Sequence, residues 1–525
     1  MGMLSLNYLM LKQKRQSRRR IQARNGTTVL PQKNSLGGHA QVGERSTYSG
    51  LNLPEDIWCH VHSLMPLQYA AQSACISHTF LRSWRSHPYL NFTEETLFLK
   101  QNASRKDYMA RHFIMRVDKI LGNHSGIGVK TLMLGFPDYC MDKFDAGHLN
   151  RWLQIAITPG IEEVILILPI YMEQCSFPCS LLFGGRGNSI RRIRLTGCAF
   201  RPPVGFDCLK SLTELYLYEV GITGDELGSL TSNCFALEKL ELAYCGQLIF
   251  LEIPLSLERL SFLRVSDCFM LQVIESKAPN LFTFVFNGEL VHYSLGESLK
   301  SLSIRSLYEP DVLSYAITKL PSAVPNLETL TVITSFGEMV NTPVVADKFL
   351  NLKYLHIDLM GACEAFPRDY DYLSLVSFLD ASPSLETFIL TVDRFGMNHD
   401  LASGDALHMR QVPGHKHSRL RKVHIIGFYS AKSMVELTCH ILENATSLES
   451  LIVDTICNPL MNDDGNRYCT PNSRCFPVER DTILEGHKAL KIVNMYIVGR
   501  APPTVKLDIR ELCSRKIGVG AAMGE

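Results

Sequence analysis

The chain has 525 residues, of which 46% are hydrophobic and 20% are charged, and its formal net charge at neutral pH is +1. This composition is that of an ordinary globular protein with ample core material, and it excludes a wholly disordered or fibrous chain. No apolar run approaches the roughly 18 residues that span a bilayer, so we expect no transmembrane helix and no membrane partner.

Residues 1–48 are predicted to be a disordered basic tail and linker, because they offer few large apolar side chains to offset the entropy cost of ordering. Seven Lys or Arg residues lie between Lys12 and Arg24. This cluster fits either a nuclear import signal or a solvated tail. No aromatic residues are interleaved with it, so we expect no specific nucleic-acid partner. The first residues do not resemble a secretory signal, which favours the nucleus or the cytoplasm and reduced cysteines.

Residues 49–92 predict three short helices. A proline followed by two acidic residues suits the first turn of the first helix, since proline lacks the N–H that this turn leaves unpaired. Ile57, Val61 and Leu64 follow at spacings of four and three residues, which places them on one helical face. A second proline-led helix and a third helix with bulky aromatic residues come next, and His87-Pro88 ends the third. So small a core is marginal alone, and a partner that buries its surplus apolar surface would stabilise it.

This helical segment resembles an F-box. It opens with Leu-Pro and an acid, continues with spaced apolar residues and a proline-led second helix, and ends with Ile-Ser ahead of an aromatic residue. In that family the module docks onto an SKP-type adaptor, and through it onto the cullin of a ubiquitin ligase. The resemblance implies that the adaptor-binding residues are Leu53, Pro54, Ile57, Val61, Leu64, Pro66, Phe80 and Trp84. The segment departs from the family where Gln68, His78 and Thr79 replace the usual Lys or Arg, and where Phe80 replaces Trp.

The segment 93–525 contains a hexad, apolar-x-x-apolar-x-apolar, that returns fourteen times. Successive hexads from Ile190 to Leu281 are separated by 22, 25, 23 and 21 residues, which is the period of leucine-rich repeats. Each repeat adds one strand and a return segment, so we predict an irregular solenoid with a curved parallel sheet. The hexads begin at Val129, Ile161, Ile190, Leu212, Leu237, Leu260, Leu281, Leu299, Leu327, Leu352, Leu385, Leu420, Leu448 and Leu490. Cysteines that follow several hexads, Cys198, Cys245 and Cys268, are predicted to be buried turn residues.

Side chains alternate along a strand, so the residues between the apolar ones are expected to line the concave wall of the solenoid. Tyr, Arg and His at these positions are residue types that protein interfaces favour. For any single residue, simple exposure to water is the better interpretation. For these residues taken together as a surface, binding of a target protein is the better interpretation. The candidate target-binding residues are Tyr216, Tyr218, Arg264, Arg305, Tyr354, His356 and His424.

Motifs for catalysis, cofactors or metals are not convincing. GNHSGIGVKT resembles a phosphate loop, but Val129 stands where that motif needs Gly before Lys. A polar loop between repeats is favoured over a metal site for the His-rich stretch, and Cys175 and Cys179 lack a second pair at zinc-finger spacing. We therefore expect no catalytic residues, no metal and no cofactor. The remaining residues weighed in this way are His399, His408, His415, His417, Cys457, Cys469 and Cys475.

An F-box followed by irregular leucine-rich repeats resembles the large plant F-box/leucine-rich-repeat class, an α/β architecture. Residues 420–525 include LEGHKALKIVNMYIVG, which is similar either to the FBD-type segment of many members or to a final repeat. The resemblance implies a non-catalytic substrate-recognition subunit of an SCF-type E3 ubiquitin ligase, whose repeats bind an unknown target protein. The alternative is a leucine-rich-repeat interaction scaffold whose diverged F-box no longer recruits a ligase.

Overall fold

The computed structural model describes most of the chain from Pro54 onward. The described residues are 54–75, 78–97, 106–140, 146–169, 175–307, 309, 311–335, 347–360, 370–393, 409–410, 415–455 and 480–510. Within them, none of the helices is both long enough and apolar enough to cross a membrane.

Three short helices begin the described chain, as predicted: α2 (Glu55–Ser63), α3 (Leu67–Ala74) and α4 (His78–Arg85). Pro54 and Pro66 stand immediately before α2 and α3 with φ of −52° and −55°, so each proline starts a helix from the N-cap rather than from its first turn. Ser77 precedes α4 and is of a residue type that favours a helix N-cap, but it lies outside the described residues.

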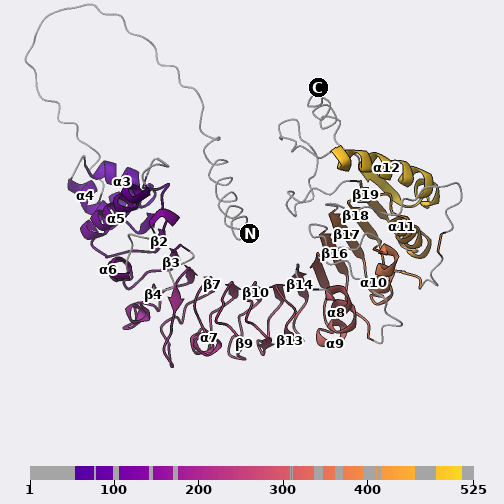
Figure 1. Ribbon diagram of the computed structural model, residues 1–525. Helices are drawn as coiled ribbons and strands as arrows, with labels where there is room; N and C mark the ends of the chain where they lie inside the picture. The colour runs from indigo at the N-terminus through magenta and orange to yellow at the C-terminus, as the bar shows by residue number, and fades with distance from the viewer. Residues whose placement is uncertain are drawn as a thin grey trace, which may run out of the picture. The chain divides into compact units, whose positions relative to one another are not determined.

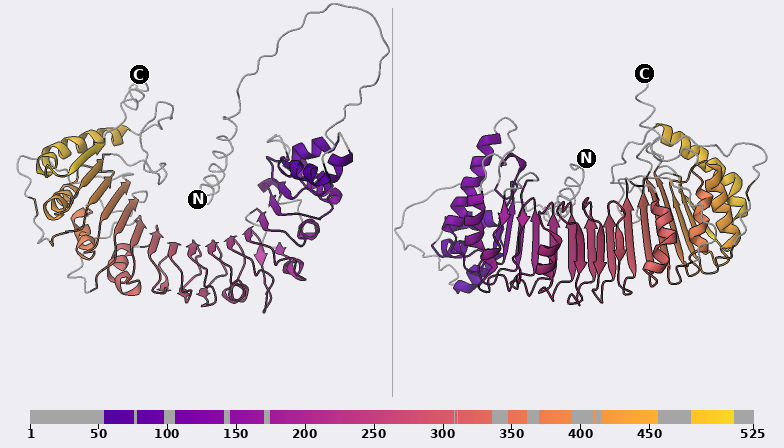
Figure 2. Two further views of the ribbon diagram at one scale, coloured as in Figure 1. Left: turned by 180° about the vertical axis from the view of Figure 1, so that it is seen from behind. Right: turned by 60° about the horizontal axis from the view of Figure 1, so that its bottom comes forward.

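Fifteen strands, all paired in parallel, form one continuous sheet that curves along its length (Figures 1 and 2). Thirteen of the fourteen predicted hexads are strands of this sheet, so the predicted solenoid is confirmed. In spatial order the strands are β1 (Tyr89–Phe92), β2 (Thr131–Gly135), β3 (Glu163–Ile167), β5 (Arg192–Thr196), β7 (Glu214–Tyr218), β8 (Lys239–Ala243), β10 (Phe262–Ser266), β12 (Thr283–Asn287), β14 (Ser301–Ser306), β15 (Thr329–Thr334), β16 (Tyr354–Met360), β17 (Thr387–Asp393), β18 (Lys422–Ile426), β19 (Ser450–Asp454) and β20 (Lys506–Arg510).

The hexad pattern produces this sheet because its apolar residues alternate along each strand. In β7, for example, Leu215 and Leu217 are buried while Glu214, Tyr216 and Tyr218 remain partly exposed on the other face. Burial of one such leucine contributes about 1.5–3 kcal/mol, and the same stripe recurs in strand after strand. Cys198, Cys245 and Cys268 are buried beneath the turns that follow their strands, as predicted.

Return segments lie behind the strands. Figure 1 shows the long sheet along the inner side of the curve and the helices outside it. The outer helices are α5 (Lys106–Asn123), α6 (Ala146–Ala156), α7 (Gly224–Thr231), α8 (Val312–Thr318), α9 (Leu320–Ala323), α10 (Val376–Asp380), α11 (Lys432–Asn444) and α12 (Arg480–Tyr496), with short 3-10 turns at Asp138–Cys140, Cys179–Leu182, Tyr372–Leu375 and Val498–Arg500. In the repeats of shortest period, short parallel strands replace helices: β9 (Phe250–Ile253), β11 (Val273–Ser276) and β13 (His292–Ser294) form one sheet. A second small sheet pairs β4 (Ser176–Phe177) with β6 (Ala199–Phe200).

The hexad prediction fails at both ends of the sheet. The hexad at Leu490 was predicted to be a strand, but it lies in α12, where Ala489 and Val493 are buried at helical spacing, with Ile497 buried just beyond the helix end. Strands β1 and β20 were missed because their hexads begin with a polar residue, His87 and Thr504 respectively. Strand β1 lies within the segment predicted to be the F-box, yet it pairs with β2 of the long sheet.

The three-helix segment joins this sheet through hydrogen bonds rather than through a free linker. The His87 ring nitrogen Nε2 lies 3.2 Å from the carbonyl oxygens of both His62 and Met65, beside the end of α2. On the other side, the Ser125 N–H donates to the Arg85 carbonyl at 2.8 Å, and the Lys130 N–H donates to the Pro88 carbonyl at 2.8 Å. The end of α4 is therefore fixed to the first repeats.

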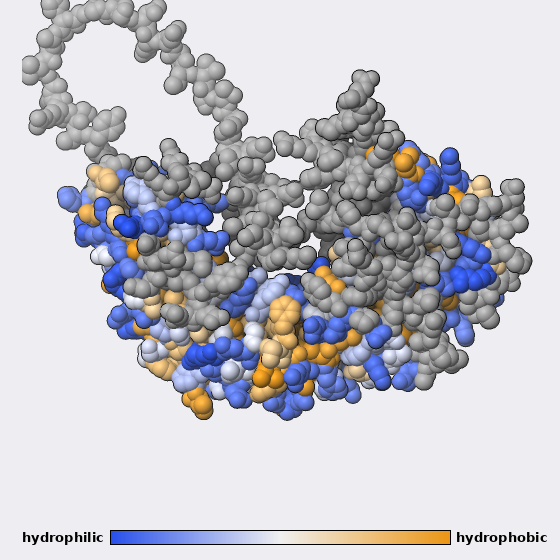
Figure 3. Space-filling model, in the orientation of Figure 1, coloured by the Kyte–Doolittle hydropathy of each residue, from blue (hydrophilic) through white to orange (hydrophobic). Residues whose placement is uncertain are grey.

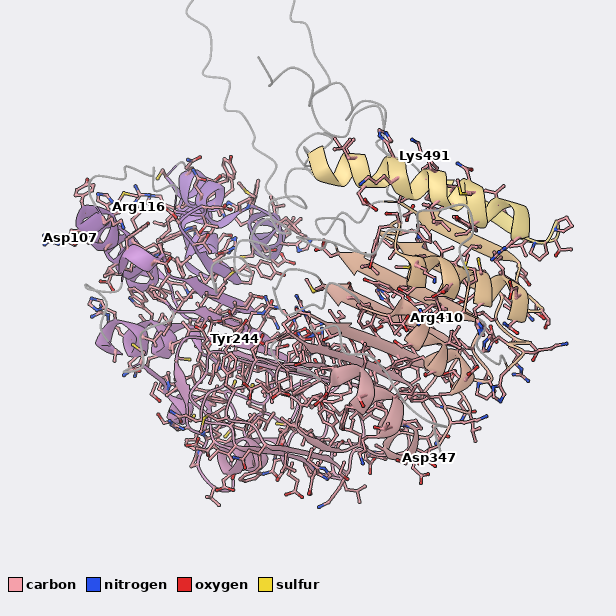
Figure 4. The ribbon with its side chains drawn as sticks, turned by 45° about the vertical axis from the view of Figure 1, so that its right-hand side comes forward. Asp107, Arg116, Tyr244, Asp347, Arg410 and Lys491 are labelled. Carbon is pink, nitrogen blue, oxygen red and sulfur yellow. The ribbon has the colours of Figure 1, made fainter. Side chains whose placement is uncertain are left out.

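An ionic cluster connects two segments near the other end of the sheet. Arg410, labelled in Figure 4, donates bidentately to Asp371 at 2.7 and 2.8 Å, and its Nε lies 2.9 Å from Glu436 Oε2. The Glu436 side chain is fully buried, in α11, whereas that of Arg410 is half exposed. Burial of a carboxylate is tolerated there because the guanidinium and the Arg410 N–H satisfy its oxygens.

Candidate protein-interaction surfaces

The first candidate surface is an apolar face on α2 and α3, which we call the helical face. Ile57 is 40% exposed, Val61 38%, Leu64 72% and Tyr69 51%. The sequence predicted the first three of these on one side of a helix, and the described part of the chain leaves them uncovered. Exposed large apolar side chains on one helical face, as Ile57, Val61 and Leu64 are, are a common sign of a protein-interaction site. Their role in binding an adaptor stays a prediction.

The other predicted adaptor-binding residues are placed differently. The Phe80 ring packs inside the three-helix segment, with its centroid 5.0 Å from Trp58 and 4.8 Å from His62. Trp84 is also half-buried, while Pro54 and Pro66 are exposed; Leu53 lies outside the described residues. Phe80 therefore contributes to the packing of the segment while it remains half-buried, and its role in binding an adaptor stays a prediction.

The second candidate surface is the solvent-facing, concave face of β5, β7, β8 and β10, which we call the ladder. Parallel register places Arg194, Tyr216, Glu241 and Arg264 in one row across these four strands. The Arg194 guanidinium lies 4.7 Å from the centroid of the Tyr216 ring. Such cation–π contacts hold long side chains against rings that remain accessible to a partner.

Charges on the ladder are arranged in pairs. Lys239 Nζ lies 2.7 Å from Glu241 and 4.8 Å from the centroid of the Phe262 ring, while Arg264 lies 3.6 Å from the same Glu241 carboxylate. Burial raises the pKa of Tyr216, so its neutral hydroxyl donates to Glu214 at 2.9 Å. Because these pairs are partly exposed, each contributes little to stability. Their consequence is a pre-ordered polar and aromatic surface.

Further along the sheet, the predicted residues are engaged across the strands. Arg305 in β14 is half-buried, with Nη2 3.8 Å from the sulfur of Met360 in β16. His356 Nε2 lies 3.0 Å from Thr391, and His424 Nε2 lies 2.7 Å from Asp454. Tyr354 is half-buried on the same face of β16 as His356. The seven predicted target-binding residues thus share one face of the sheet but not one local cluster.

An aromatic row at the strand ends was only partly predicted. Tyr218, which was predicted, has its ring centroid 5.1 Å from that of Tyr244, and Tyr244 lies 6.2 Å from Phe269. Figure 4 labels Tyr244 beside the strands of the long sheet. Sequence reasoning missed Tyr244 and Phe269 because they follow their hexads instead of lying within them. The signal was present in the repeat register, since Tyr244 directly follows β8 and Phe269 lies three residues after the end of β10.

Residues weighed as metal ligands do not form a metal site in the described part of the chain. No group of three or more His, Cys, Asp or Glu residues there could hold a metal ion. Cys175 and Cys179 are buried among apolar side chains, and Val129 is buried in the core rather than lining a phosphate loop. His399, His408, Cys457, Cys469 and Cys475 lie outside the described residues.

His417 is buried against Asp380 and His440 instead. Its Nε2 lies 3.8 Å from Asp380, and its ring centroid lies 5.9 Å from that of His440. Burial lowers the pKa of His417 to about 4, and the neighbouring His440 and His415 act in the same direction. The neutral imidazole is therefore the form that fits the folded chain.

We expect His417 to make the protein less stable as the pH falls from 6.5 to 4. In this range His417 is protonated in the unfolded chain, where its pKa is near 6.5, but stays neutral in the folded chain. The free energy of unfolding should fall by about 2–3 kcal/mol, partly offset by Asp380, whose pKa is raised by burial. Thermal melts of the wild type and of His417→Gln at pH 7 and pH 4.5 measure the difference. His415→Gln, at an exposed position, is the control, and an equal pH dependence in all three proteins would contradict the prediction.

Comparison with known proteins places the repeats in a family. The family described as At1g61320/AtMIF1, LRR domain, matches residues 120–514, about three quarters of the chain. Among curated Arabidopsis thaliana proteins, F-box/LRR-repeat protein At3g58940 is 24% identical over 22% of this chain and 18% of its own length. F-box/LRR-repeat protein 25 is 23% identical over 45% of this chain and 84% of its own. F-box/FBD/LRR-repeat protein At1g13570 is 22% identical over 64% of this chain and 74% of its own. The match thus covers less than a fifth of the length of At3g58940 but more than two thirds of the length of the other two relatives.

Proposed function

This chain belongs to the family of the At1g61320/AtMIF1 LRR domain and is a plant-type F-box/leucine-rich-repeat protein, and we propose that it is the substrate-recognition subunit of an SCF-type ubiquitin ligase. The three-helix segment would dock an SKP-type adaptor, and the repeats would hold a target protein. The chain itself performs no covalent step in this proposal. Its contribution is proximity, because binding raises the effective concentration of target lysines near the ubiquitin-charged enzyme.

The observation that carries the proposal is the helical face. Ile57, Val61 and Leu64 lie at helical spacing on one short helix segment, and all three are exposed. Covering the three side chains with a partner would contribute several kcal/mol, at about 1.5–3 kcal/mol for each large group fully buried. An adaptor with a complementary apolar groove is the partner that the resemblance to an F-box implies.

The ladder supports the other half of the proposal. It presents Tyr, Arg and Lys side chains on neighbouring strands, ordered by contacts such as that of Arg194 with Tyr216. Tyrosine and arginine are the residues on which protein interfaces most often depend for affinity. The ladder and the helical face lie on different elements, so one subunit can bind an adaptor and a target together.

The proposal is tested by mixing the purified full-length chain with a purified SKP-type adaptor. We expect the two proteins to elute together as a one-to-one complex in size-exclusion chromatography, with a dissociation constant below about 1 μM. A well-folded chain that does not bind the adaptor would contradict the ligase proposal. That result would favour an interaction scaffold instead, for which the neutral or weakly basic side chains of Gln68, His78 and Thr79 are the supporting observation.

A further inference from the structure

Five consecutive strands end in the same backbone step. The residue after each strand is left-handed: φ is 69° at Gly197, 51° at Glu219, 54° at Tyr244, 51° at Asp267 and 139° at Gly288. In the first four cases the N–H of this residue donates to the carbonyl of the last residue of the next strand, at 2.7 to 3.1 Å. The Gly288 N–H donates to the carbonyl of Arg305, the last residue but one of β14, at 2.9 Å. The step is thus a repeated device by which the turns of neighbouring repeats are joined.

Glycine is the residue that this step favours, and the outer two repeats use it. At Gly197 a Cβ would also lie 2.8 Å from the Leu168 carbonyl oxygen, so no larger residue fits there. The three central repeats instead place Glu219, Tyr244 and Asp267 in a conformation that costs a side chain of this kind free energy. Strained positions of this sort gather where a side chain has a task other than folding.

The three strained side chains converge with the aromatic row. Tyr244 lies between the rings of Tyr218 and Phe269. Burial raises the pKa of Tyr244, and the nearby Asp267 carboxylate adds to this effect, while Glu219 and Asp267 both act on Tyr218 in the same direction. Two carboxylates therefore flank a pair of neutral phenol rings at the carboxyl ends of these central strands. We call this group of strand ends the edge.

Of the two carboxylates, Asp267 is hydrogen-bonded to the Tyr244 side chain, whereas Glu219 keeps an unsatisfied oxygen within the described residues. Glu219 Oε2 is buried without a hydrogen-bond partner, and burial raises the pKa of this carboxyl. Neither Glu219 nor Asp267 takes part in an ion pair there, while Lys239 on β8 and Arg264 on β10 both pair with Glu241. Buried polar atoms are nearly always hydrogen-bonded, so an unsatisfied carboxylate oxygen points to a donor that a ligand would supply.

Exposed apolar surface continues the edge on its outer side. Phe269 is 59% exposed and Met270 is 53% exposed. Figure 3 shows hydrophobic side chains gathered over the middle of the sheet, around the position of β10 in Figure 1. A ligand seated here would meet an apolar shelf, aromatic faces and negative charge together.

We propose that Tyr218, Glu219, Tyr244, Asp267 and Phe269 bind a lysine or arginine side chain of the target protein, an inference that rests on the target-binding half of the proposed function. The rings would contact the aliphatic stem and the charged head by cation–π interaction, and the two carboxylates would accept its N–H donors. Met270 would contact an apolar neighbour of the basic residue. An acidic segment would meet like charge at the same place, so the edge selects by charge as well as by shape.

The test uses the full-length protein and immobilised peptide libraries with a fixed central residue between random positions. We expect retention on the arginine or lysine library to exceed that on the glutamate library by about tenfold, given one charge-assisted hydrogen bond and one cation–π contact. The double variant Glu219→Gln, Asp267→Asn should lose this preference. The matched control is Glu252→Gln, since Glu252 is an exposed carboxylate on β9, away from the edge, and pairs with Lys277. Equal retention on the basic and acidic libraries, or a preference that survives the double variant, overturns the proposal.

Tyr244→Gly separates a binding role from a structural one. Glycine adopts φ of 54° without strain, so the melting temperature should stay equal or rise while retention on the basic library falls about fivefold or more. A lower melting temperature with unchanged library preference would show a packing role only and overturn the proposal. Adaptor binding is measured on the same samples. Loss of the adaptor with library preference intact would contradict the ligase role alone, and the reverse would contradict the edge alone.

Discussion

Replacing Val61 with glutamate should abolish binding of the SKP-type adaptor, whereas the same replacement at Val204 should leave binding unchanged. Val61 lies between Ile57 and Leu64 on the helical face, so in the complex its side chain would be removed from water. A carboxylate placed in that contact would lose its hydration without gaining a partner. An unpaired buried charge costs about 3–5 kcal/mol, which corresponds to a loss of affinity of about 100-fold or more.

Val204 is the matched control because it is almost fully exposed and lies among the repeats, far along the chain from α2. Both variants carry the same added charge, and binding can be compared by isothermal titration calorimetry. Melting temperatures should agree with the wild type within a few degrees, since neither side chain is in the core. Wild-type affinity in Val61→Glu would show that the helical face is not the docking site.

Arg410→Ala should lower the free energy of unfolding of the repeat domain by about 2–3 kcal/mol, which is less than the full cost of breaking a buried pair because Lys432 remains near the carboxylate. Removal of Arg410 leaves the fully buried Glu436 without its main donors. Glu436→Gln should cost less, because Arg410 keeps its bidentate contact with Asp371. The asymmetry arises since only one of the two partners is shielded from water.

Arg421→Ala provides the control for the loss of an arginine. Arg421 lies 3.8 Å from Glu449, and both side chains are more than half exposed, so the change should cost no more than about 0.5 kcal/mol. Urea unfolding monitored by circular dichroism measures all three variants. Equal destabilisation by Arg410→Ala and Arg421→Ala would contradict the assignment of Arg410 as the partner that makes burial of Glu436 tolerable.

Much of the fold could be predicted because the hexad reports strand and burial together. Leu215 and Leu217 are buried two residues apart, and no helix gives that spacing on one face. The hexad at Leu490 was misleading because its first two apolar positions, three residues apart, also suit a helical turn. At β1 and β20 a polar first residue hides a strand that the sheet forms by pairing with its neighbour, which is a tertiary effect outside any local pattern.

The surfaces were predicted less completely. Exposure of Ile57, Val61 and Leu64 followed from helical spacing in a segment too small to cover them. The position of Phe80 did not, since its contact with Trp58 depends on how α2 and α4 pack. The strained residues such as Tyr244 were invisible for another reason: a left-handed backbone is suggested by glycine, and there the sequence has tyrosine.

Only Ser86, His87 and Pro88 separate α4 from the first strand, and His87 and Pro88 are hydrogen-bonded on both sides. This connection is short and hydrogen-bonded, so we expect the three-helix segment and the repeats to move as one rigid body. In the proposed function, a target protein bound to the sheet would therefore be held in one fixed orientation relative to the rest of the ligase. Which of its lysines receive ubiquitin would then be decided by geometry, and lengthening this joint by a few glycines should broaden the set of modified sites.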